Sequence, residues 1–239
     1  MQGRKPITTI TADSWLSDQL EKPVFNLAFP TSCCIHPSLP DGPCLVSCRI
    51  DCSQTEVISE LKAVGFVEMC VNLTYEINAP FRVSSEIDGV RHAASSDRVA
   101  VGEVAAGSFE FDRFHQDPEI PDSTASELKS TWAKNFFLGR RGDFLLVAVS
   151  SKDIAGFVQI IKKSEDCLVI DLIAVEERFR NQGIATKLIE SVMTRLSDKT
   201  RTVRAGTQAA NARSRALYSR LGFKVVSKEC VLHLHRRES

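Results

Sequence analysis

The sequence predicts a mixed α/β fold (α/β or α+β) built on one sheet. Between residues 143 and 175, three apolar runs of strand length are separated by short turns. Downstream of Gly183, apolar residues recur every three or four positions, as they do in amphipathic helices. Because the first strands follow one another directly, we expect them to be antiparallel. The later strands should be joined by helices.

Length and composition restrict the classes of protein. The chain has 239 residues, of which 43% are apolar, and this fits two small domains with a real core. Its 30 Lys and Arg balance 30 Asp and Glu, so no basic excess indicates nucleic acid. No apolar run approaches the roughly 18 residues of a membrane span, and the basic N-terminus lacks the apolar stretch of a secretory signal. We expect a soluble, cytoplasmic monomer or homodimer that binds neither nucleic acid nor membrane.

The eight cysteines raise the question of a metal site or disulfides. Cys44, Cys48 and Cys52 are spaced by four, but the segment around them has the pattern of a strand. The sequence contains no Cys-x-x-Cys pair. We therefore expect buried free thiols rather than a metal site or disulfides.

The chain divides into an N-terminal block, residues 1–84, and a larger C-terminal domain, residues 85–239. The apolar pattern ends in Leu73–Glu86, where proline, serine and charged residues take over. In the C-terminal domain, Asp97 is a suitable N-cap for a helix that follows a short extended piece. The other expected elements are a polar loop over 111–125, a helix over 126–139, strands over 143–150, 153–163 and 167–175, a helix after Gly183, an extended piece over 202–211, a helix over 212–223 and a strand or hairpin over 224–236.

Two segments of the chain resemble each other. Leu61–Ile77 and Tyr218–Arg236 both contain the end of a helix, a Gly-Phe stop and then a stretch expected to form two strands. This similarity predicts that the N-terminal block is a partial repeat of the C-terminal domain.

The segment RFRNQGIA, Arg178–Ala185, lies between the apolar strand 167–175 and an amphipathic helix. The N-terminus of a helix has unpaired N–H groups and partial positive charge. Gly183 has no Cβ, so an anion can approach the backbone closely. This pattern predicts a phosphate-binding loop. The alternative is a tight turn with solvated arginines, because short glycine motifs have low specificity.

The loop and a downstream segment together resemble a known family. Arg180–Ala185 resembles the acyl-CoA-binding motif Q/R-x-x-G-x-G/A of the GNAT acetyltransferases, with alanine where many members have the second glycine. About 25 residues later, Asn211–Val226 is similar to the second signature of the family, with Asn, Tyr and Gly-Phe at the family's spacing. The resemblance extends over residues 87–236 and implies the GNAT fold.

The same resemblance implies an N-acetyltransferase that uses acetyl-CoA and no metal. The strand before the loop would splay from its neighbour and pair with the pantetheine amides, and the loop would hold the pyrophosphate. Asn211 matches the family's asparagine near the pantetheine arm. The cofactor-binding residues implied in this way are Ile173, Ala174, Val175, Arg180, Asn181, Gln182, Gly183, Ile184, Ala185, Thr186 and Asn211.

Two residues are candidates for the chemistry. Tyr218 would be the general acid, since a phenol has a suitable pKa to protonate a leaving thiolate. It is expected on a polar helix face with Asn211 and Ser214, and the alternative is a packed core aromatic. Asp171 is the one charge inside an apolar strand and is the candidate base, with a structural salt bridge as the alternative.

The acceptor is inferred from a narrower resemblance. An N-terminal block ahead of a complete GNAT domain, with the loop Phe111–Pro121, resembles the TDP-fucosamine acetyltransferase type (WecD type). This implies a partial GNAT-like N-terminal domain and a small amine acceptor, such as a nucleotide-linked 4-amino-4,6-dideoxyhexose. In that loop Arg113 would bind the diphosphate. His115 would orient or deprotonate the amine, although such histidines are more often solvated.

Two other functions remain open. In the first, the enzyme acetylates a protein N-terminus or a polyamine. In the second, the chain is a regulatory module that binds acetyl-CoA without catalysis. His233 and His235 alternate on the last expected strand, where we expect a structural role and no metal triad.

Overall fold

A computed structural model describes residues 9–28, 39–81, 89–195 and 200–238. These residues form a ten-stranded sheet with the order β1-β2-β3-β10-β4-β9-β8-β7-β6-β5. Neighbouring strands are antiparallel, except that β2 runs parallel to β3 and β8 to β9. The mixed sheet predicted from the sequence is confirmed. The strands are β1 (Thr9–Ala12), β2 (Val24–Ala28), β3 (Cys44–Asp51), β4 (Val67–Asn78), β5 (Val90–His92), β6 (Phe144–Ser150), β7 (Asp153–Lys162), β8 (Cys167–Val175), β9 (Thr202–Gln208) and β10 (Lys224–Arg236).

Helices cover both faces of the C-terminal strands. The helices α3 and α4 share one apolar cluster with β6, β7 and the second half of β8, whereas α5 and α6 share another with the opposite face. None of the helices in the described part of the chain has the length and apolar character that a membrane-spanning helix needs. The helices are α1 (Ser14–Leu20), α2 (Thr55–Ala63), α3 (Arg98–Ala106), α4 (Asp122–Lys134), α5 (Ile184–Arg195) and α6 (Ala212–Arg220), with 3-10 turns η1 (Ser95–Asp97), η2 (Asn135–Leu138) and η3 (Glu177–Phe179).

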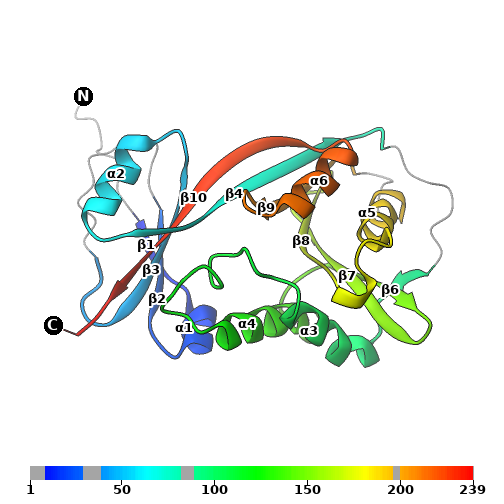
Figure 1. Cartoon of the computed structure of the whole chain (residues 1–239), viewed down its shortest axis with the longest axis horizontal. Helices are drawn as coiled ribbons and strands as arrows, with labels where there is room; N and C mark the ends of the chain where they lie inside the picture. Colours follow the sequence, from blue (N-terminus) through cyan, green and yellow to red (C-terminus); the bar gives the residue numbers. More distant parts are fainter. Residues whose placement is uncertain (1–8, 29–38, 82–88, 196–199, 239) are drawn as a thin grey trace.

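The last strand joins the two parts of the chain. β10 lies between β3 and β4 and pairs with both, from Glu229↔Asp51 on one side and from Lys224↔Glu76 on the other. β4 in turn pairs with β9. Figure 1 shows β4 and β10 crossing the top of the molecule from the N-terminal strands to the C-terminal ones, above α1, α4 and α3. The sheet is therefore continuous across the expected boundary at residues 84 and 85, which itself lies outside the described residues.

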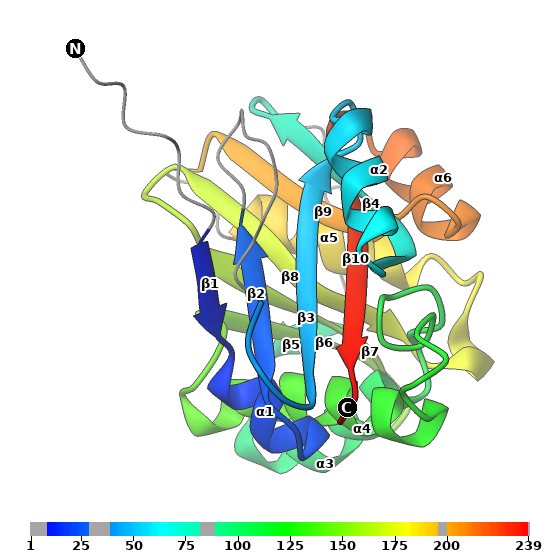
Figure 2. The same cartoon turned by 90° about the vertical axis from the view of Figure 1, so that its left-hand side faces the viewer.

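The sheet is also strongly twisted. Figure 2 shows β1, β2, β3 and β10 running at a steep angle across β8, β7 and β6 behind them. A right-handed twist between neighbouring strands accumulates in this way over a wide sheet. As a result, the concave side of the sheet encloses α1, α4 and the loop before α4.

The internal similarity corresponds to a repeat in the sheet. Gly65 and Gly222 differ by 157 positions, and each ends a helix with a positive φ before a long strand. The same shift converts the β3–β10 pair Asp51↔Glu229 into the β9–β4 pair Gln208↔Asn72. The two-strand stretch expected after each Gly-Phe stop is a single strand in both places, β4 and β10, with bulges between them. Each continues as one strand because it has a partner on both sides. For residues 224–236 a single strand was one of the two alternatives.

One helix begins earlier than expected. α4 begins at Asp122 instead of Ser126, and Pro121 takes the N-cap position with φ −58°. Proline is suited to a helix start because its φ is already restricted, and the carboxylate of Asp122 favours the positive end of the helix.

The described cysteines lie on strands of both parts of the chain or directly after one, as Cys167 on β8 and Cys230 on β10 show. Cys44 and Cys48 are buried on β3, as the strand pattern predicts. Burial raises the pKa of Cys48 to about 12, so this thiol stays protonated. The Sγ atoms of Cys52 and Cys230 lie 3.1 Å apart, and both residues are free thiols. Cys33 and Cys34 fall outside the described residues.

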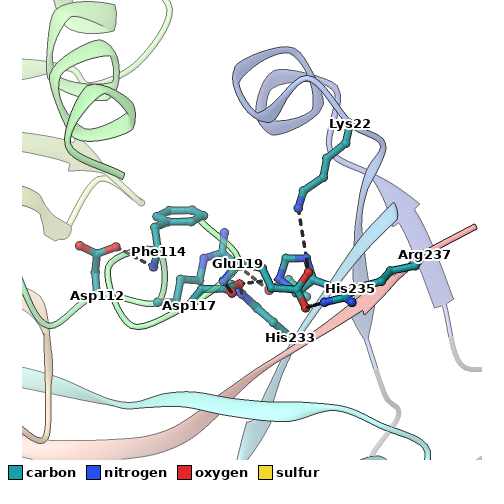
Figure 3. Close-up of polar contacts among 10 residues, drawn as sticks. Lys22, Asp112, Phe114, Asp117, Glu119, His233, His235 and Arg237 are labelled. Carbon is teal, nitrogen blue, oxygen red and sulfur yellow. Dashed lines mark hydrogen bonds and ion pairs between the residues drawn. The ribbon is translucent and has the colours of Figure 1, made fainter. Parts of the chain in front are cut away.

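A polar cluster attaches the loop before α4 to β10. Asp117 Oδ2 accepts hydrogen bonds from His233 Nδ1 at 2.6 Å and from His235 Nε2 at 2.7 Å (Figure 3). Lys22 Nζ lies 3.1 Å from His235 Nδ1, on the other side of the ring. We expected a structural role for these histidines and no metal triad; the structure places Asp117 beside them, with ligand atoms of the three residues within 4.8 Å of one another, a spacing that could hold a metal ion. With the Lys22 ammonium beside it, we interpret the group as a hydrogen-bonded cluster that fixes the loop.

The position of β10 predicts that both parts of the chain unfold together. Leu232 is fully buried, so Leu232→Ala should lower the free energy of unfolding by about 2–5 kcal/mol. Circular dichroism during urea denaturation should show one transition, shifted to lower urea concentration. Val225→Ala, at a site 42% exposed on the same strand, should change stability little. Two separate transitions, with the second unaffected by Leu232→Ala, would contradict the prediction.

The Asp117 cluster predicts lower stability at acidic pH. Burial lowers the pKa of His233, against the opposing effect of Asp117. Burial alone would raise the pKa of Asp117, but the two histidines hold it below its usual value. In both cases the unfolded chain binds protons more readily, so stability should fall as pH drops below about 6.5 and further near pH 4.

Urea denaturation at pH 7.5, 6.0 and 5.0 measures this dependence. His233→Gln removes the first titration and should flatten the change in unfolding free energy between pH 7.5 and 5.0. Glu165→Gln, at a surface carboxylate 76% exposed, is the matched control and should keep the wild-type slope. An unchanged slope in His233→Gln would show that the cluster does not set the pH dependence.

Candidate functional site

The two central strands of the C-terminal part separate along their length. β8 and β9 pair from Cys167↔Thr202 to Ile170↔Ala205, and no pair of the described residues continues the ladder. β8 nevertheless stays paired with β7 as far as Val175, and β9 with β4 as far as Gln208. The backbone of each strand therefore keeps one hydrogen-bonding edge that has no strand partner. Such edges bind extended, amide-containing ligands well.

A bulge at Asp171 marks the point of separation. Gln159 and Ile160 are consecutive on β7, but their partners on β8 are Leu172 and Ile170, so Asp171 is an extra residue. Before the bulge, Leu168 and Ile170 pack on the side of α5. After it, Leu172 and Ala174 pack on the side of α3 and α4.

The loop after β8 forms the second wall of the site. Asn181 and Gly183 have φ values of +64° and +77°, and a Cβ on Gly183 would meet no atom within 4 Å. Within the described residues, the backbone N–H groups of residues 181–186 make no hydrogen bond. Unpaired amides at the start of α5 are the arrangement that binds anions, and this supports the predicted phosphate loop.

The strand edge and the loop line one cavity, which we call the β8–β9 cavity. Its volume is about 340 Å³. All the residues expected to bind the cofactor line it, except Gln182, whose amide donates to the Arg178 carbonyl at 3.3 Å instead. The lining residues are Ser108, Glu110, Phe111, Ile173, Ala174, Val175, Phe179, Arg180, Asn181, Gly183, Ile184, Ala185, Thr186, Asn211, Arg213, Ser214, Ala216, Leu217 and Arg220.

Arginines give the β8–β9 cavity a positive character. Arg180 is fixed by hydrogen bonds to the carbonyls of Val175 and Gly107, at 3.2 and 3.3 Å. Arg213 and Arg220 on α6 also line the cavity, and Arg220 donates to Thr186 Oγ1 at 3.3 Å. Sequence reasoning missed these two residues. Their spacing of seven, which places two residues on one helix face, was the available signal.

Tyr218 lies in the core and not on the polar face expected for it. It is 1% exposed and packs between Tyr75 and Phe223, with ring centroids 5.3 and 5.4 Å away. Asn211 and Ser214 line the β8–β9 cavity, but Tyr218 is not among the lining residues. Burial raises the pKa of Tyr218, so the phenol stays protonated. Its role as a general acid stays a prediction, beside the packed core aromatic that was the alternative.

Asp171 forms a structural salt bridge, which was the alternative to a role as the base. Its carboxylate accepts two hydrogen bonds from Arg141, at 2.6 and 2.7 Å. It accepts two more from Trp132 Nε1 at 3.2 Å and Gln159 Nε2 at 3.1 Å. The side chain is 9% exposed and points to the side of α4. A carboxylate held by four donors is poorly placed to accept a proton, so the structure argues against Asp171 as the base.

Neither of the two residues expected in the acceptor wall lines the β8–β9 cavity. Arg113 lines a second cavity, away from the β8–β9 cavity. His115 lines neither of these cavities. Its Nδ1 is bound to Asp112 Oδ2 at 2.7 Å, and its side chain is 10% exposed. The expected role of His115 therefore has no support in its position, because its polar loop folds inward against α4.

A family model and one curated protein match the chain. The model of the acetyltransferase (GNAT) family matches residues 109–223. The spore coat polysaccharide biosynthesis protein SpsD of Bacillus subtilis (strain 168) is 32% identical over 139 residues. This alignment covers 58% of the present chain and 47% of SpsD, so the chain spans about half the length of that relative.

Solved structures share the fold at low sequence identity. A tandem GNAT protein from the clavulanic acid biosynthesis pathway has a TM-score of 0.58 at 14% identity, over 91% of this chain and 77% of that protein. A GCN5-related N-acetyltransferase from Sphaerobacter thermophilus has a TM-score of 0.58 at 18% identity, over 83% of this chain and 62% of that one. Both likenesses concern the fold alone. The segment that matches the model of the acetyltransferase (GNAT) family, residues 109–223, holds the splayed strands and the loop.

Proposed function

We propose that this chain transfers the acetyl group of acetyl-CoA to the primary amine of a small acceptor. The observation that carries the proposal is the β8–β9 cavity, where an unpaired strand edge meets the free amides of an anion-binding loop. An elongated ligand with amides at one end and phosphates at the other fits both walls. When bound, acetyl-CoA supplies the acetyl group as an activated thioester.

The residues of the cavity divide between these two parts of the ligand. The backbone of Ile173–Val175 would pair with the pantetheine amides, since its edge has no strand partner on that side. The amides of residues 181–186, with Arg180, would hold the pyrophosphate. Asn211 accepts the N–H of Ser214 at 3.0 Å, which fixes the start of α6 beside the cavity. The positive φ of Gly183 is one that a residue with a side chain adopts only with strain.

The acceptor amine must be neutral to attack, so a base nearby would help. Glu110 is the one carboxylate among the described residues that line the β8–β9 cavity, and we propose it in place of Asp171. Tyr218 would donate a proton to the leaving thiolate. Its hydroxyl makes no hydrogen bond with the described residues, and its phenol is protonated at neutral pH.

We propose an amino sugar as the acceptor, linked to a nucleotide, such as a 4-amino-4,6-dideoxyhexose. The name of SpsD, a spore coat polysaccharide biosynthesis protein, supports the sugar class. The resemblance to the TDP-fucosamine acetyltransferase type supports the nucleotide link. Soluble cytoplasmic location is part of the same proposal, because nucleotide-linked sugars are cytoplasmic metabolites.

One observation favours a second function. The burial of Tyr218 and the ion pair of Asp171 remove two expected catalytic groups from the cavity wall. A regulatory module that binds acetyl-CoA without transferring the acetyl group would have this appearance. The two functions differ in turnover and not in binding.

Calorimetry with acetyl-CoA tests the cavity. Gly183→Ala adds a Cβ to the loop and strains its backbone, so affinity should fall about tenfold or more. Gly42→Ala is a matched control. The φ of Gly42 is +78°, close to the +77° of Gly183, and a Cβ at either residue would meet no atom within 4 Å. Gly42 does not line the β8–β9 cavity. If both variants bind as the wild type does, the loop does not hold the ligand.

Release of free thiol, measured with a panel of amines, tests the chemistry. We expect turnover with a nucleotide-linked 4-amino-4,6-dideoxyhexose. Tyr218→Phe and Glu110→Gln should each reduce kcat by about 10²-fold or more with little effect on acetyl-CoA affinity. Asp171→Asn keeps the shape of the side chain and one acceptor oxygen, and it should reduce kcat less than Glu110→Gln. Normal acetyl-CoA binding without turnover on any amine would support the regulatory module instead.

A further inference from the structure

A second cavity lies where the N-terminal block meets α4. Its volume is about 290 Å³, and residues from both parts of the chain line it. We call it the tryptophan cavity, because it holds both tryptophans of the chain. No residue lines both this cavity and the β8–β9 cavity. The lining residues are Asp13, Trp15, Leu16, Arg113, Trp132, Asn135, Arg140 and Arg141.

Positive charge exceeds negative charge around the tryptophan cavity. Arg141 is neutralised by Asp171, but Arg113 and Arg140 have no ion pair among the described residues. The guanidinium of Arg113 donates to Ser47 Oγ at 2.5 Å, which leaves most of its donors without a protein acceptor. Burial and the nearby Arg49 lower the pKa of Arg113 to about 10, while the charges of Asp13 and Asp112 act in the opposite direction. Neither carboxylate forms an ion pair with the guanidinium, so its remaining donors are available to an anionic ligand.

The acidic residue of the cavity does not cancel this charge pattern. Asp13 is the N-cap of α1, where Oδ1 accepts the N–H of Leu16 at 3.0 Å and Oδ2 accepts from Asn26 at 3.1 Å. Its carboxylate therefore serves the helix start, and it stabilises α1 in the position that presents Trp15.

Asn135 adds an amide to the wall of the cavity. The residue is 6% exposed and lines the cavity. Its backbone carbonyl accepts from the N–H of Arg140 at 3.0 Å. Its side-chain amide makes no hydrogen bond with the described residues, and it is not one of their fully buried unpaired groups. The amide therefore faces the open cavity, where it can donate to or accept from a polar group of a ligand.

The indoles add a surface for a ring. Trp15 and Trp132 meet edge to face, with centroids 5.5 Å apart, and Arg141 lies 4.4 Å above the Trp132 ring. Trp132 is fixed by its hydrogen bond to Asp171. Fixed indoles bind the apolar face of a sugar or stack on a base. At about 290 Å³ the cavity holds one ring with its phosphate, which is less than a whole nucleotide-linked sugar.

We propose that the tryptophan cavity binds a phosphorylated ring, with Arg113 and Arg140 on the phosphate, Asn135 on a polar group and the two indoles on the ring. The inference rests on the proposed function, because the phosphate-bearing end of the acceptor is the ligand it suits. Asp171 connects the two cavities. Its side chain holds Trp132 and Arg141, and its backbone begins the unpaired edge of β8.

This assignment gives the N-terminal block a function. Trp15, Leu16 and Asp13 belong to α1 and its cap, and Ser47, which holds Arg113, lies on β3. The C-terminal domain supplies the other five of the eight lining residues. A ligand in this cavity therefore binds at the contact between the two parts.

Fluorescence of the two tryptophans reports directly on this cavity. We expect dTDP and glucose 1-phosphate to change the emission in a saturable manner. Thymidine and glucose, which lack phosphate, should have no such effect. The phosphorylated compound that binds more tightly identifies the source of the phosphate. If thymidine or glucose binds as tightly as its phosphorylated form, the charge argument is wrong.

Variants separate this cavity from the β8–β9 cavity. Arg113→Met should weaken binding of dTDP at least tenfold and leave acetyl-CoA affinity unchanged in calorimetry. Arg140→Met, at an exposed residue, should weaken dTDP severalfold without affecting the fold, so it replaces Arg113→Met if that variant does not fold. Arg213→Met changes a residue of the β8–β9 cavity. It should weaken binding of acetyl-CoA and leave the affinity for dTDP unchanged.

The two proposals can fail separately. Saturable binding of dTDP without any binding of acetyl-CoA would refute the proposed function and leave this site standing. Acetyl-CoA-dependent turnover without binding of either phosphorylated compound would refute this site and leave the function standing. Equal losses of dTDP affinity in Arg113→Met and Arg213→Met would also overturn the assignment.

Discussion

The backbone ladders on the two sides of β10 are the constraint on which the rest of the molecule depends. Through them, a strand from the end of the chain completes the sheet of the N-terminal block and joins it to β4. This places α1 beside α4, and it carries His233 and His235 to the loop that ends before α4. The tryptophan cavity exists because these elements meet. A deletion of the N-terminal block would remove part of the sheet as well as one wall of that cavity.

The second organising feature is the bulge at Asp171. One extra residue in β8 ends the pairing with β9 and turns the following side chains to the other face. The strand edge that is released faces the loop before α5, and the carboxylate faces Trp132 and Arg141 on the opposite side. A single residue thereby connects the backbone of one cavity with the side chains of the other. We regard Asp171 as a positioning residue for both.

Much of the fold could be predicted from the sequence, because its signals are local. Local signals depend on neighbouring residues only, and the structure has the corresponding elements at or near the expected positions. These elements are the strands between residues 143 and 175, the helix stops at Gly139 and Gly222 and the loop at Gly183. The roles of Tyr218 and Asp171 could not be predicted in the same way. Their surroundings come from Tyr75 on β4 and from Arg141 and Trp132, which are distant in sequence.

The sequence by itself determined the elements, their order and the open glycine loop before α5, because hydrogen bonding, periodicity and glycine conformation act over a few residues. The tertiary structure decided which side chains became core and which became cavity wall. Tyr218 is buried because β4 and Phe223 enclose it, and Arg113 faces a cavity because Ser47 and α1 arrive from another part of the chain. These outcomes depend on strand pairings more than a hundred residues apart in sequence, such as Glu229 with Asp51, and local patterns carry no information about them.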